Sequence, residues 1–405
     1  MSVAERTPES PVTPSNPASI VTTSSIRAAI APVLDRLRAT SAQRDADRTH
    51  PFAEIRGLAE AGILRYRVPH EDGGAGATIR ELAELVVDIA AADSNVAQAL
   101  RPGFLVADGL ATGTLSGVKH DRTLARVLAG DLFAGTRNEA TGKPGQISTR
   151  LTRDSSGLRV TGEKFYSTGA LHARWFSGNA VDDDGGVVTF TVPTDSEGVV
   201  LIDDFDAVGQ RLTASGTTRL DGVLVDPEEV EAVSAQSGHP HGSLAHLILA
   251  ATLAGIAEAA QNDAVRLVRG VTRPIKHSTA VRSADDPYVR LTVGRIAAAA
   301  FTARAQVISA AEQLDAYWAG PRDPLGVQAT IAVAEAYVGA GEQALAAGEL
   351  LFDVGGGTLT RREHNLDRHW RNARTVANHN PRGWKSAVVG GWLVADEPPP
   401  ANGLF

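Results

Sequence analysis

The 405-residue chain has no cysteine and no excess of basic residues. Without cysteine it cannot form disulfide bonds, thiolate zinc sites, cysteine-ligated iron–sulfur clusters or a cysteine nucleophile, and it suits a reducing compartment. Its formal net charge is −8, whereas nucleic-acid-binding proteins normally show clustered lysine and arginine. These absences predict a cytoplasmic protein without a nucleic-acid partner.

A long apolar run is also missing. A membrane-spanning helix needs roughly 18 to 20 uninterrupted apolar residues. The best stretch, Leu244–Ala260, is broken by His246, Thr252 and Glu258, so it predicts a buried bundle helix and no membrane contact. Residues 1–22 are rich in Ser, Thr and Pro and lack the basic start and apolar centre of a signal peptide, which predicts a disordered tail.

Hydrophobic side chains make up 43% of the chain, enough for a large core, and they fall into three zones. A helical pattern predicts an N-terminal helical domain over residues 23–130. A period of two with Gly, Asp and Pro boundaries predicts a central β domain over residues 131–233. An alanine-rich helical pattern predicts a helix bundle over residues 234–396, followed by a tail over 397–405. The expected fold class is α+β, mainly α.

The same patterns place individual elements. Residues 51–62 show a helical apolar face that ends at Gly62, and another helix is expected over Ile79–Ala92. No helical connection supports a parallel sheet in the central zone. The expected strands are Ile147–Thr152, Leu158–Thr161, Val187–Val192, Val199–Ile202 and Thr217–Val225. The expected later helices are one with a seven-residue seam through Val293, Ala300, Val307 and Leu314, then Val327–Phe352, Asn365–Ala377 and Pro381–Val394.

A first chemical signal is the segment Lys164–Gly169, which places an aromatic ring and two hydroxyls at the end of a strand. The hydroxyls of Ser167 and Thr168 can hydrogen-bond a polar heterocycle while Phe165 packs on its face. From the residues alone, an ordinary strand end explains the segment better.

A second signal is the segment Asn365–Arg374, in which Arg368, Arg371 and Arg374 recur at spacings of three and share one helical side. Such a stripe can bind phosphates or carboxylates, and a salt-bridged bundle face is an equally good interpretation.

The histidines and glycines carry weaker signals. His364, His369 and His379 lie five and ten residues apart and point in different directions, and His239 and His241 belong to a linker, so we expect no metal site. Gly355–Gly357 predicts a helix stop, or a place where cofactor phosphates approach bare backbone amides.

Three motifs in this order carry a resemblance to a family: Leu64–Pro69 followed by the Gly73–Gly76 turn, Gly209–Thr217, and Leu366–Arg374. Over roughly residues 25 to 395 the chain resembles the acyl-CoA dehydrogenase fold superfamily. Within it the chain is most similar to the two-component flavin-dependent monooxygenases, the kin of dibenzothiophene monooxygenase, N-hydroxylases and an indole hydroxylase. The resemblance implies a β-barrel-like central domain, a C-terminal four-helix bundle and a homotetramer or homodimer.

The resemblance also implies the chemistry. A separate NAD(P)H:flavin reductase would supply reduced flavin, FADH2 or FMNH2, which reacts with O2 to give a C4a-(hydro)peroxyflavin that oxygenates the substrate. The implied flavin-binding residues are Asn138, Phe165, Ser167, Thr168, Ser215, Arg273, Gly355 and Gly356. The implied catalytic residues are His379, which titrates near working pH and would orient or protonate the peroxide, and Ser167.

Departures from the family pattern refine this expectation. In the dehydrogenase branch a glutamate abstracts a proton six residues after an Arg-Asp-Ala-Lys motif, and here that position is Asn380, which cannot act as a base. Relatives often carry histidines where this chain has Gly103 and Val376. Together with Asn380 these residues would line a roomier, apolar pocket for a fused aromatic or heteroaromatic substrate. An acyl-CoA dehydrogenase and an inactive binding scaffold remain as alternatives.

Overall fold

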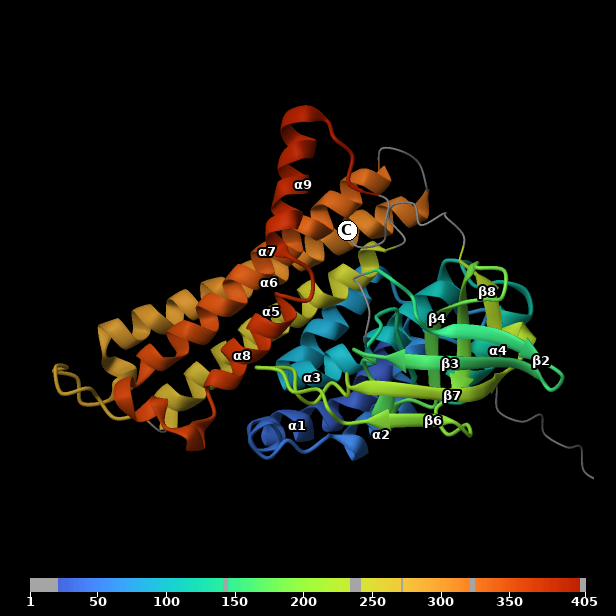
Figure 1. Ribbon diagram of the computed structural model, residues 1–405. Helices are drawn as coiled ribbons and strands as arrows, with labels where there is room; N and C mark the ends of the chain where they lie inside the picture. Colours follow the sequence, from blue (N-terminus) through green and yellow to red (C-terminus); the bar gives the residue numbers. More distant parts are fainter. Residues whose placement is uncertain (1–20, 141–144, 234–241, 271, 321–324, 401–405) are drawn as a thin grey trace, which may run out of the picture.

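A computed structural model of the chain describes residues 21–140, 145–233, 242–270, 272–320 and 325–400. The predicted disordered tail lies outside these residues except for its last two positions, and so do the linker histidines His239 and His241. The elements follow one another as helices, strands and helices again, and Figure 1 shows the sheet at one end of a long helix bundle.

The N-terminal part consists of helices α1 (Thr23–Asp47), α2 (Phe52–Glu60), α3 (Ile79–Ala111) and α4 (Gly117–Leu128). Gly62 follows α2 with a φ of 78°, which confirms the predicted left-handed end. Helix α3 was expected to end at Ala92 but continues to Ala111, because the chain only kinks there. Asp93 has non-helical angles, φ −158° and ψ 111°, and its carboxylate accepts from the backbone N–H of Asn95 at 3.0 Å, as a new helix cap does.

The central part is one mixed sheet. Among the described residues its strands pair in the order β6-β7-β3-β2-β4-β5-β8, with β1 paired to β4. The strands are β1 (Phe133–Thr136), β2 (Arg150–Asp154), β3 (Gly157–Lys164), β4 (Trp175–Val181), β5 (Val187–Pro193), β6 (Val199–Ile202), β7 (Thr217–Val225) and β8 (Val230–Ala232). The five strands expected from the sequence are present, and β1, β4 and β8 are additional.

The sequence shows no helical connection that supports a parallel sheet, yet the mostly antiparallel sheet contains parallel pairings. Strand β1 runs parallel to β4, in a register that pairs Phe133 with Trp175 and Thr136 with Gly178. The connection between them contains the β2–β3 hairpin instead of a helix, so the helical signature of a parallel crossover never appears in the sequence.

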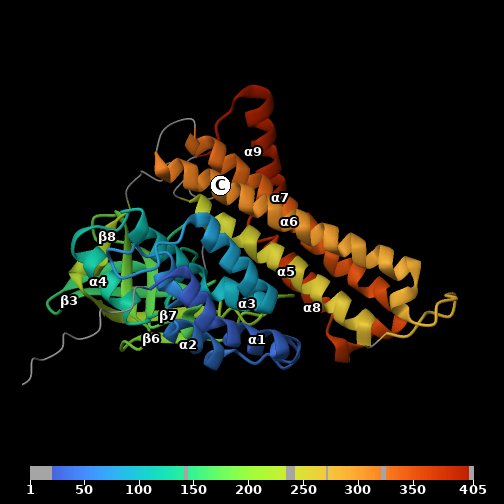
Figure 2. The same cartoon turned by 180° about the vertical axis from the view of Figure 1, so that it is seen from behind.

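The C-terminal part contains α5 (Ser243–Gly270), α6 (Pro287–Ala319), α7 (Leu325–Leu350), α8 (Asp367–Val376) and α9 (Arg382–Ala395). Helix α5 packs against α3, α6 and α7, and α9 stands off the bundle beside α7 (Figures 1 and 2). Within the described residues α5 alone is long and apolar enough to cross a membrane, but 83% of its apolar window is buried inside the protein. The predicted seam of α6 is buried at Ala300, Val307 and Leu314.

Candidate active site

The hydroxyl-bearing segment predicted to bind a cofactor lies where β3 ends against α3. Tyr166 follows β3 with a φ of 57°, and Gly169 has a φ of 81°, so both lie in the left-handed region. A Cβ atom on Gly169 would lie 2.5 Å from the carbonyl oxygen of Ala99 in α3. Only glycine therefore allows this approach, which brings Ser167 and Thr168 to the boundary between the sheet and the N-terminal helices.

Three hydroxyls form a buried chain beside this turn, and a fourth has no partner. Ser215 Oγ donates to Thr168 Oγ1 at 3.1 Å and lies 2.8 Å from Thr213 Oγ1. Ser167 Oγ is buried, and no atom of the described residues hydrogen-bonds to it. Because leaving a buried polar group unpaired costs about 1 to 3 kcal/mol, Ser167 Oγ is well placed to meet a ligand.

Two more predicted residues share this edge of the sheet. The half-buried Phe165 donates its backbone N–H to the carbonyl of Asn138 at 3.3 Å, and its own carbonyl accepts from Thr136 Oγ1 at 2.8 Å. Five of the predicted flavin-binding residues, Asn138, Phe165, Ser167, Thr168 and Ser215, are thus brought together around the ends of β1 and β3.

The Gly209–Thr217 motif connects this edge to the helices. The kink in α3 turns Asn95 so that its Oδ1 accepts from the backbone N–H of Leu212 at 3.1 Å. On the other side, Asn372 Oδ1 in α8 accepts from the backbone N–H of Gln210 at 2.6 Å. A Cβ on Gly209 would lie 2.2 Å from a carbonyl oxygen of α8, so glycine is required at this crossing.

His379 follows α8 and faces α3. Its Nε2 lies 3.3 Å from an Nη2 of Arg101, and its Nδ1 lies 2.9 Å from Asn380 Oδ1. Since a guanidinium only donates, Nε2 accepts and Nδ1 carries the proton. The imidazole keeps solvent access, but the protein around it and the charge of Arg101 lower its pKa to about 4. His379 is therefore neutral at pH 7, which corrects the expectation that it titrates near working pH.

Tyr337 of α7 fixes the turn that carries His379. The buried phenol donates to the carbonyl of Val376 at 2.8 Å and accepts from the backbone N–H of Asn380 at 3.2 Å. Asn380, the residue at the position of the dehydrogenase base, is itself buried beside His379. The turn is therefore a rigid part of the bundle.

The predicted substrate-pocket residues Gly103 and Val376 do not face open space. A Cβ on Gly103 would lie 2.9 Å from both methyl carbons of Leu64, and Val376 is 2% exposed in the hydrophobic core. The space that a side chain at Gly103 would occupy is taken by Leu64, so no cavity is left there. The inference of a roomier pocket from these two positions is therefore not supported.

The remaining flavin-binding candidates lie elsewhere. Gly355 follows α7, and a Cβ there would lie 2.6 Å from Thr272 Cγ2, so it sits beside the loop that carries Arg273. The neighbouring Gly356 has a φ of 62° and would place its Cβ 3.7 Å from Ile275 of that loop. Figure 1 shows the connection from α5 to α6 at the far end of the bundle from the sheet. Within one chain these three candidates do not join Ser167.

The arginine stripe of α8 is largely a salt-bridged face. Arg368 Nη2 lies 2.5 Å from Asp263 Oδ2 of α5, and His369 Nε2 lies 2.9 Å from the same oxygen. Arg371 lies 2.7 Å from Asp45 of α1. For Arg368 and Arg371 the structural interpretation is the one that the contacts support.

Sequence reasoning missed three basic side chains beside His379. Arg101 projects from α3, His246 from α5 and Lys385 from α9, and Lys385 Nζ lies 3.4 Å from His246 Nδ1. Burial lowers the pKa of Lys385 to about 8. The available signal was His246 itself, a polar residue inside the most apolar stretch of the chain.

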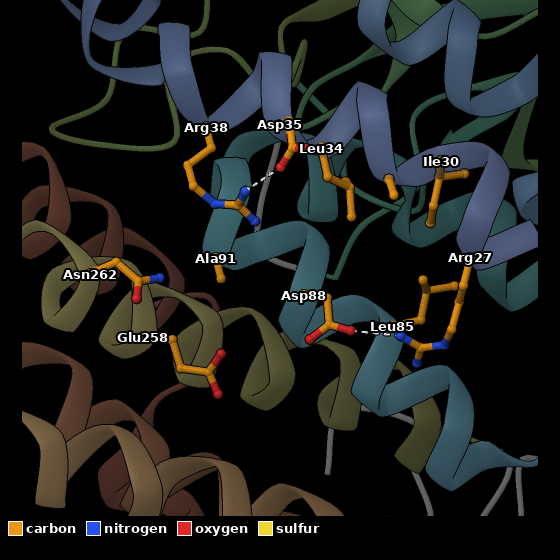
Figure 3. A pocket seen from close by; sticks show the side chains of 11 residues that line it. Arg27, Ile30, Leu34, Asp35, Arg38, Leu85, Asp88, Ala91, Glu258 and Asn262 are labelled. Atoms are coloured by element: carbon orange, nitrogen blue, oxygen red, sulfur yellow. Dashed lines mark hydrogen bonds and ion pairs between the residues drawn. The ribbon is translucent and has the colours of Figure 1, made fainter. Parts of the chain in front are cut away.

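A surface pocket of about 320 Å³ lies away from these residues, between α1, α3 and α5 (Figure 3). Its charges are already paired, because Arg27 lies 2.7 Å from Asp88 and Arg38 lies 2.7 Å from Asp35. None of its lining residues was predicted to bind a cofactor or substrate. The predicted residues that the contacts above bring together lie instead around the sheet edge, α3 and the turn after α8.

Comparisons with known proteins match both helical parts. Residues 23–115 match the acyl-CoA dehydrogenase N-terminal domain, and residues 247–381 match the acyl-CoA dehydrogenase C-terminal domain. The chain is 28% identical to a probable FMNH2-dependent monooxygenase, SfnC of Pseudomonas putida, over 89% of this chain and 92% of the relative. It is also 28% identical to dibenzothiophene monooxygenase of Rhodococcus qingshengii, over 88% and 90%.

A solved structure shares the fold. TdsC from Paenibacillus sp. A11-2, in complex with FMN and indole, superposes with a TM-score of 0.84 at 23% identity, covering 94% of this chain and 100% of TdsC. The two domain matches together span more than half of the chain, one before and one after the strands in the sequence. The chain therefore belongs to the acyl-CoA dehydrogenase family.

Proposed function

We propose that this protein is the oxygenase of a two-component system in the cytoplasm. It takes reduced FMN from a separate NAD(P)H:flavin reductase and uses O2 to oxygenate a small aromatic or heteroaromatic substrate. The observation that carries the proposal is the arrangement around Asn380, where an amide stands at the position of the family's carboxylate base and the Nδ1 of His379 lies 2.9 Å from its Oδ1. The names of the relatives, FMNH2-dependent and dibenzothiophene monooxygenases, support it.

The residues at the end of β3 fit a flavin ring. The ring presents polar atoms along its edge and apolar faces, and here a buried hydroxyl without a partner, Ser167 Oγ, lies two residues from the half-buried Phe165. When bound, reduced flavin supplies the two electrons with which one oxygen atom of O2 enters the substrate and the other leaves as water.

The chain's own residues then have distinct tasks. Ser167 hydrogen-bonds the ring, while Thr168 and Ser215 hold its segment through their hydroxyl chain. Neutral His379 donates its Nδ1–H to Asn380 Oδ1 and presents Nε2 as a hydrogen-bond acceptor. The rigid turn after α8 fixes the positions of His379 and Asn380. These groups position the reactants and limit the loss of oxygen as peroxide.

The dehydrogenase alternative lacks its base. An acyl-CoA dehydrogenase removes an α-proton with a carboxylate, and the amide of Asn380 cannot accept that proton at neutral pH. Anaerobic bleaching of bound oxidised flavin by an acyl-CoA would favour this alternative over the oxygenase.

A labelling experiment tests the function. The protein is supplied with NADH, FMN and a flavin reductase under ¹⁸O2, with indole, indole-3-carboxylate and dibenzothiophene as probe substrates. We expect a product that carries one ¹⁸O atom and that disappears when the oxygenase is omitted. Consumption of NADH with hydrogen peroxide as the sole product from all three probes would contradict the proposal.

Replacing Ser167 by alanine should weaken reduced-FMN binding by about 10-fold without loss of stability. The variant removes a hydrogen bond to the flavin, which weakens binding. In the flavin-free protein the same hydroxyl is buried and unpaired, so its removal does not lower the free energy of unfolding. Anaerobic titration and thermal unfolding measure the two effects.

The matched control is Ser177→Ala on β4, whose hydroxyl donates to the carbonyl of Phe190 at 3.1 Å. It should lower stability by about 1 kcal/mol and leave flavin affinity unchanged. The same affinity in Ser167→Ala as in the parent would remove Ser167 from the flavin site.

We infer that a second copy of the chain completes the flavin site in a homodimer or homotetramer. Gly355 and Gly356 lie beside the loop that carries Arg273, and that loop connects α5 to α6 at the far end of the bundle from the sheet, so one flavin can meet these residues and Ser167 only across two chains. Large apolar side chains on α6 and α9 are exposed, as expected of an interface. They are Tyr288, Leu291, Phe301, Trp384, Leu393 and Val394.

A further inference from the structure

Four basic side chains from four different elements converge beside the proposed reaction site. Arg101 of α3 contacts His379 at 3.3 Å, and Lys385 of α9 contacts His246 of α5 at 3.4 Å. The two pairs are neighbours, because burial, followed by the nearby basic groups of Lys385, His379 and Arg101, lowers the pKa of His246 to about 3. We call these four residues the basic cluster.

The basic cluster carries positive charge at pH 7. His246 and His379 are neutral there, whereas Arg101 remains protonated with a pKa of about 10, and Lys385 is largely protonated with a pKa of about 8. Arg101 is half-buried. Protein interiors rarely hold charged groups without a compensating group, because removing an ion from water costs several kcal/mol.

Arg101 is the member whose charge is visibly uncompensated. Its Nε is buried without a hydrogen-bond partner, and no carboxylate of the described residues forms an ion pair with it. Burial lowers its pKa, and the one group that opposes this effect is the phenol of Tyr337. By contrast, the buried Arg44 and Arg368 each pair with an aspartate. The Nε edge of the Arg101 guanidinium, an arrangement that suits a carboxylate, is thus left without a partner in the described part of the chain.

The position of Arg101 connects the basic cluster to the proposed flavin site. Arg101 lies two residues after Ala99, whose carbonyl oxygen packs against Gly169 next to Ser167 and Thr168. Its other neighbour, His379, lies beside Asn380 at the position of the family base. An anion bound by Arg101 is therefore held beside His379 and the position of the family base.

We propose that the basic cluster binds a carboxylate group of the substrate, so that the enzyme oxygenates aromatic acids in preference to neutral rings. This inference rests on the proposed oxygenase function and adds the substrate class. The guanidinium of Arg101 would donate to the carboxylate, and His379 would hold the guanidinium in place through Nε2. The phosphate of FMN is the other anion that such a cluster can recognise, and the experiment separates the two.

The test compares two probes that differ by one carboxylate. Indole and indole-3-carboxylate are titrated into the full-length protein saturated with oxidised FMN, so no turnover is needed. A charge-assisted hydrogen bond from Arg101 predicts that the acid binds about 10- to 100-fold more tightly than indole. Equal affinities, or no binding of the acid at millimolar concentration, would overturn the proposal using the parent protein alone.

Variants assign the effect to Arg101. Arg101→Gln should abolish the preference for the acid, and Arg101→Lys should restore part of it. The control is Arg27→Gln, because Arg27 already pairs with Asp88 in the pocket of Figure 3, and it should leave the preference unchanged. A preference for the acid that persists in Arg101→Gln would show that the cluster does not hold it.

A second arm identifies the source of the anion. FMN and riboflavin, which differ by the phosphate, are titrated into the parent and into Arg101→Gln. The proposal predicts that the variant loses no more affinity for FMN than for riboflavin. A selective loss of FMN affinity would assign the cluster to the cofactor phosphate and overturn the substrate assignment. Because all these readouts are binding constants, failure of the oxygenase reaction would leave them intact and would be recognised separately.

Discussion

Replacing His379 by alanine is expected to lower the yield of oxygenated product by about 10² or more and to divert reducing equivalents to hydrogen peroxide. The imidazole bridges Arg101 and Asn380, at 3.3 Å and 2.9 Å, so its loss removes both contacts. Groups that assist proton movement at a reacting centre typically contribute 10² to 10⁴ in rate. Product yield and peroxide release, measured together, report the change in coupling, which is the fraction of reducing equivalents that ends in oxygenated product.

The substitution His379→Gln separates two roles. A glutamine oxygen can accept from Arg101 but cannot exchange a proton, so recovery of coupling would make His379 a positioning residue. The control His120→Ala alters a histidine of α4 that contacts Asp121 and should leave coupling unchanged. Coupling in His379→Ala equal to that of the parent would reduce the residue to a packing role.

The pKa of His379 adds a pH dependence. With a folded pKa of about 4, the imidazole is neutral throughout the range from pH 6 to 9. Coupling should therefore show no transition near the ordinary histidine pKa of about 6.5 in the parent. A transition centred there that vanishes in His379→Gln would contradict the neutral assignment.

Replacing Asp263 by asparagine is expected to lower the free energy of unfolding by about 3 to 5 kcal/mol. The Asp263 carboxylate, 13% exposed, meets Arg368 at 2.5 Å and His369 at 2.9 Å. Removing one partner of a buried ion pair leaves an uncompensated charge, here the guanidinium of Arg368. Urea unfolding of the two proteins measures the difference.

The control is Asp367→Asn. Its carboxylate lies 2.7 Å from Arg371 but is 57% exposed, so its loss should cost less than about 1 kcal/mol. Comparable losses in the two variants would show that burial of the Asp263 cluster contributes little.

The same cluster predicts sensitivity to acid. Burial alone would raise the pKa of Asp263, but the hydrogen bond from His369 and the charge of Arg368 outweigh it and hold this pKa well below its usual value. The stabilisation that the ionised carboxylate gives the fold is therefore present above about pH 4 and is lost as the pH falls further. Burial and the charge of Arg368 lower the pKa of His369 to about 4. As the pH is lowered, His369 is therefore protonated in the unfolded chain before it is protonated in the folded protein. This difference lowers the free energy of unfolding between about pH 6.5 and pH 4.

Local patterns in the sequence were sufficient for most elements. The helix ending at Gly62 and strands β6 and β7 follow from periodicity and turn residues, because each depends on its own neighbours. The predicted end at Ala92 coincides with the kink in α3, but continuation to Ala111 depends on the contacts of Asp93 with Arg44 and Asn95. Such contacts between distant segments leave no periodic signal.

The candidate site residues also divide into those that one short segment carries and those that distant segments bring together. Ser167 and Thr168 could be proposed from the sequence because their hydroxyls lie in one short segment after a strand, to which the family resemblance then gave a role. The basic cluster was missed because Arg101 and Lys385 come from opposite ends of the chain and meet only through helix packing. The roomier pocket predicted from Gly103 gains no support, because Leu64 lies against that position and the sequence does not show this contact.

The central claim is that the protein reacts reduced FMN with O2 in a controlled way. The most direct measurement mixes the anaerobic complex of protein and reduced FMN with O2 in a stopped-flow spectrometer. The oxygenase predicts rapid consumption of O2 in a first phase, with oxidised FMN appearing only in a slower second phase. Appearance of oxidised FMN and hydrogen peroxide in a single phase at the rate of free reduced FMN, with and without aromatic substrates, would contradict it.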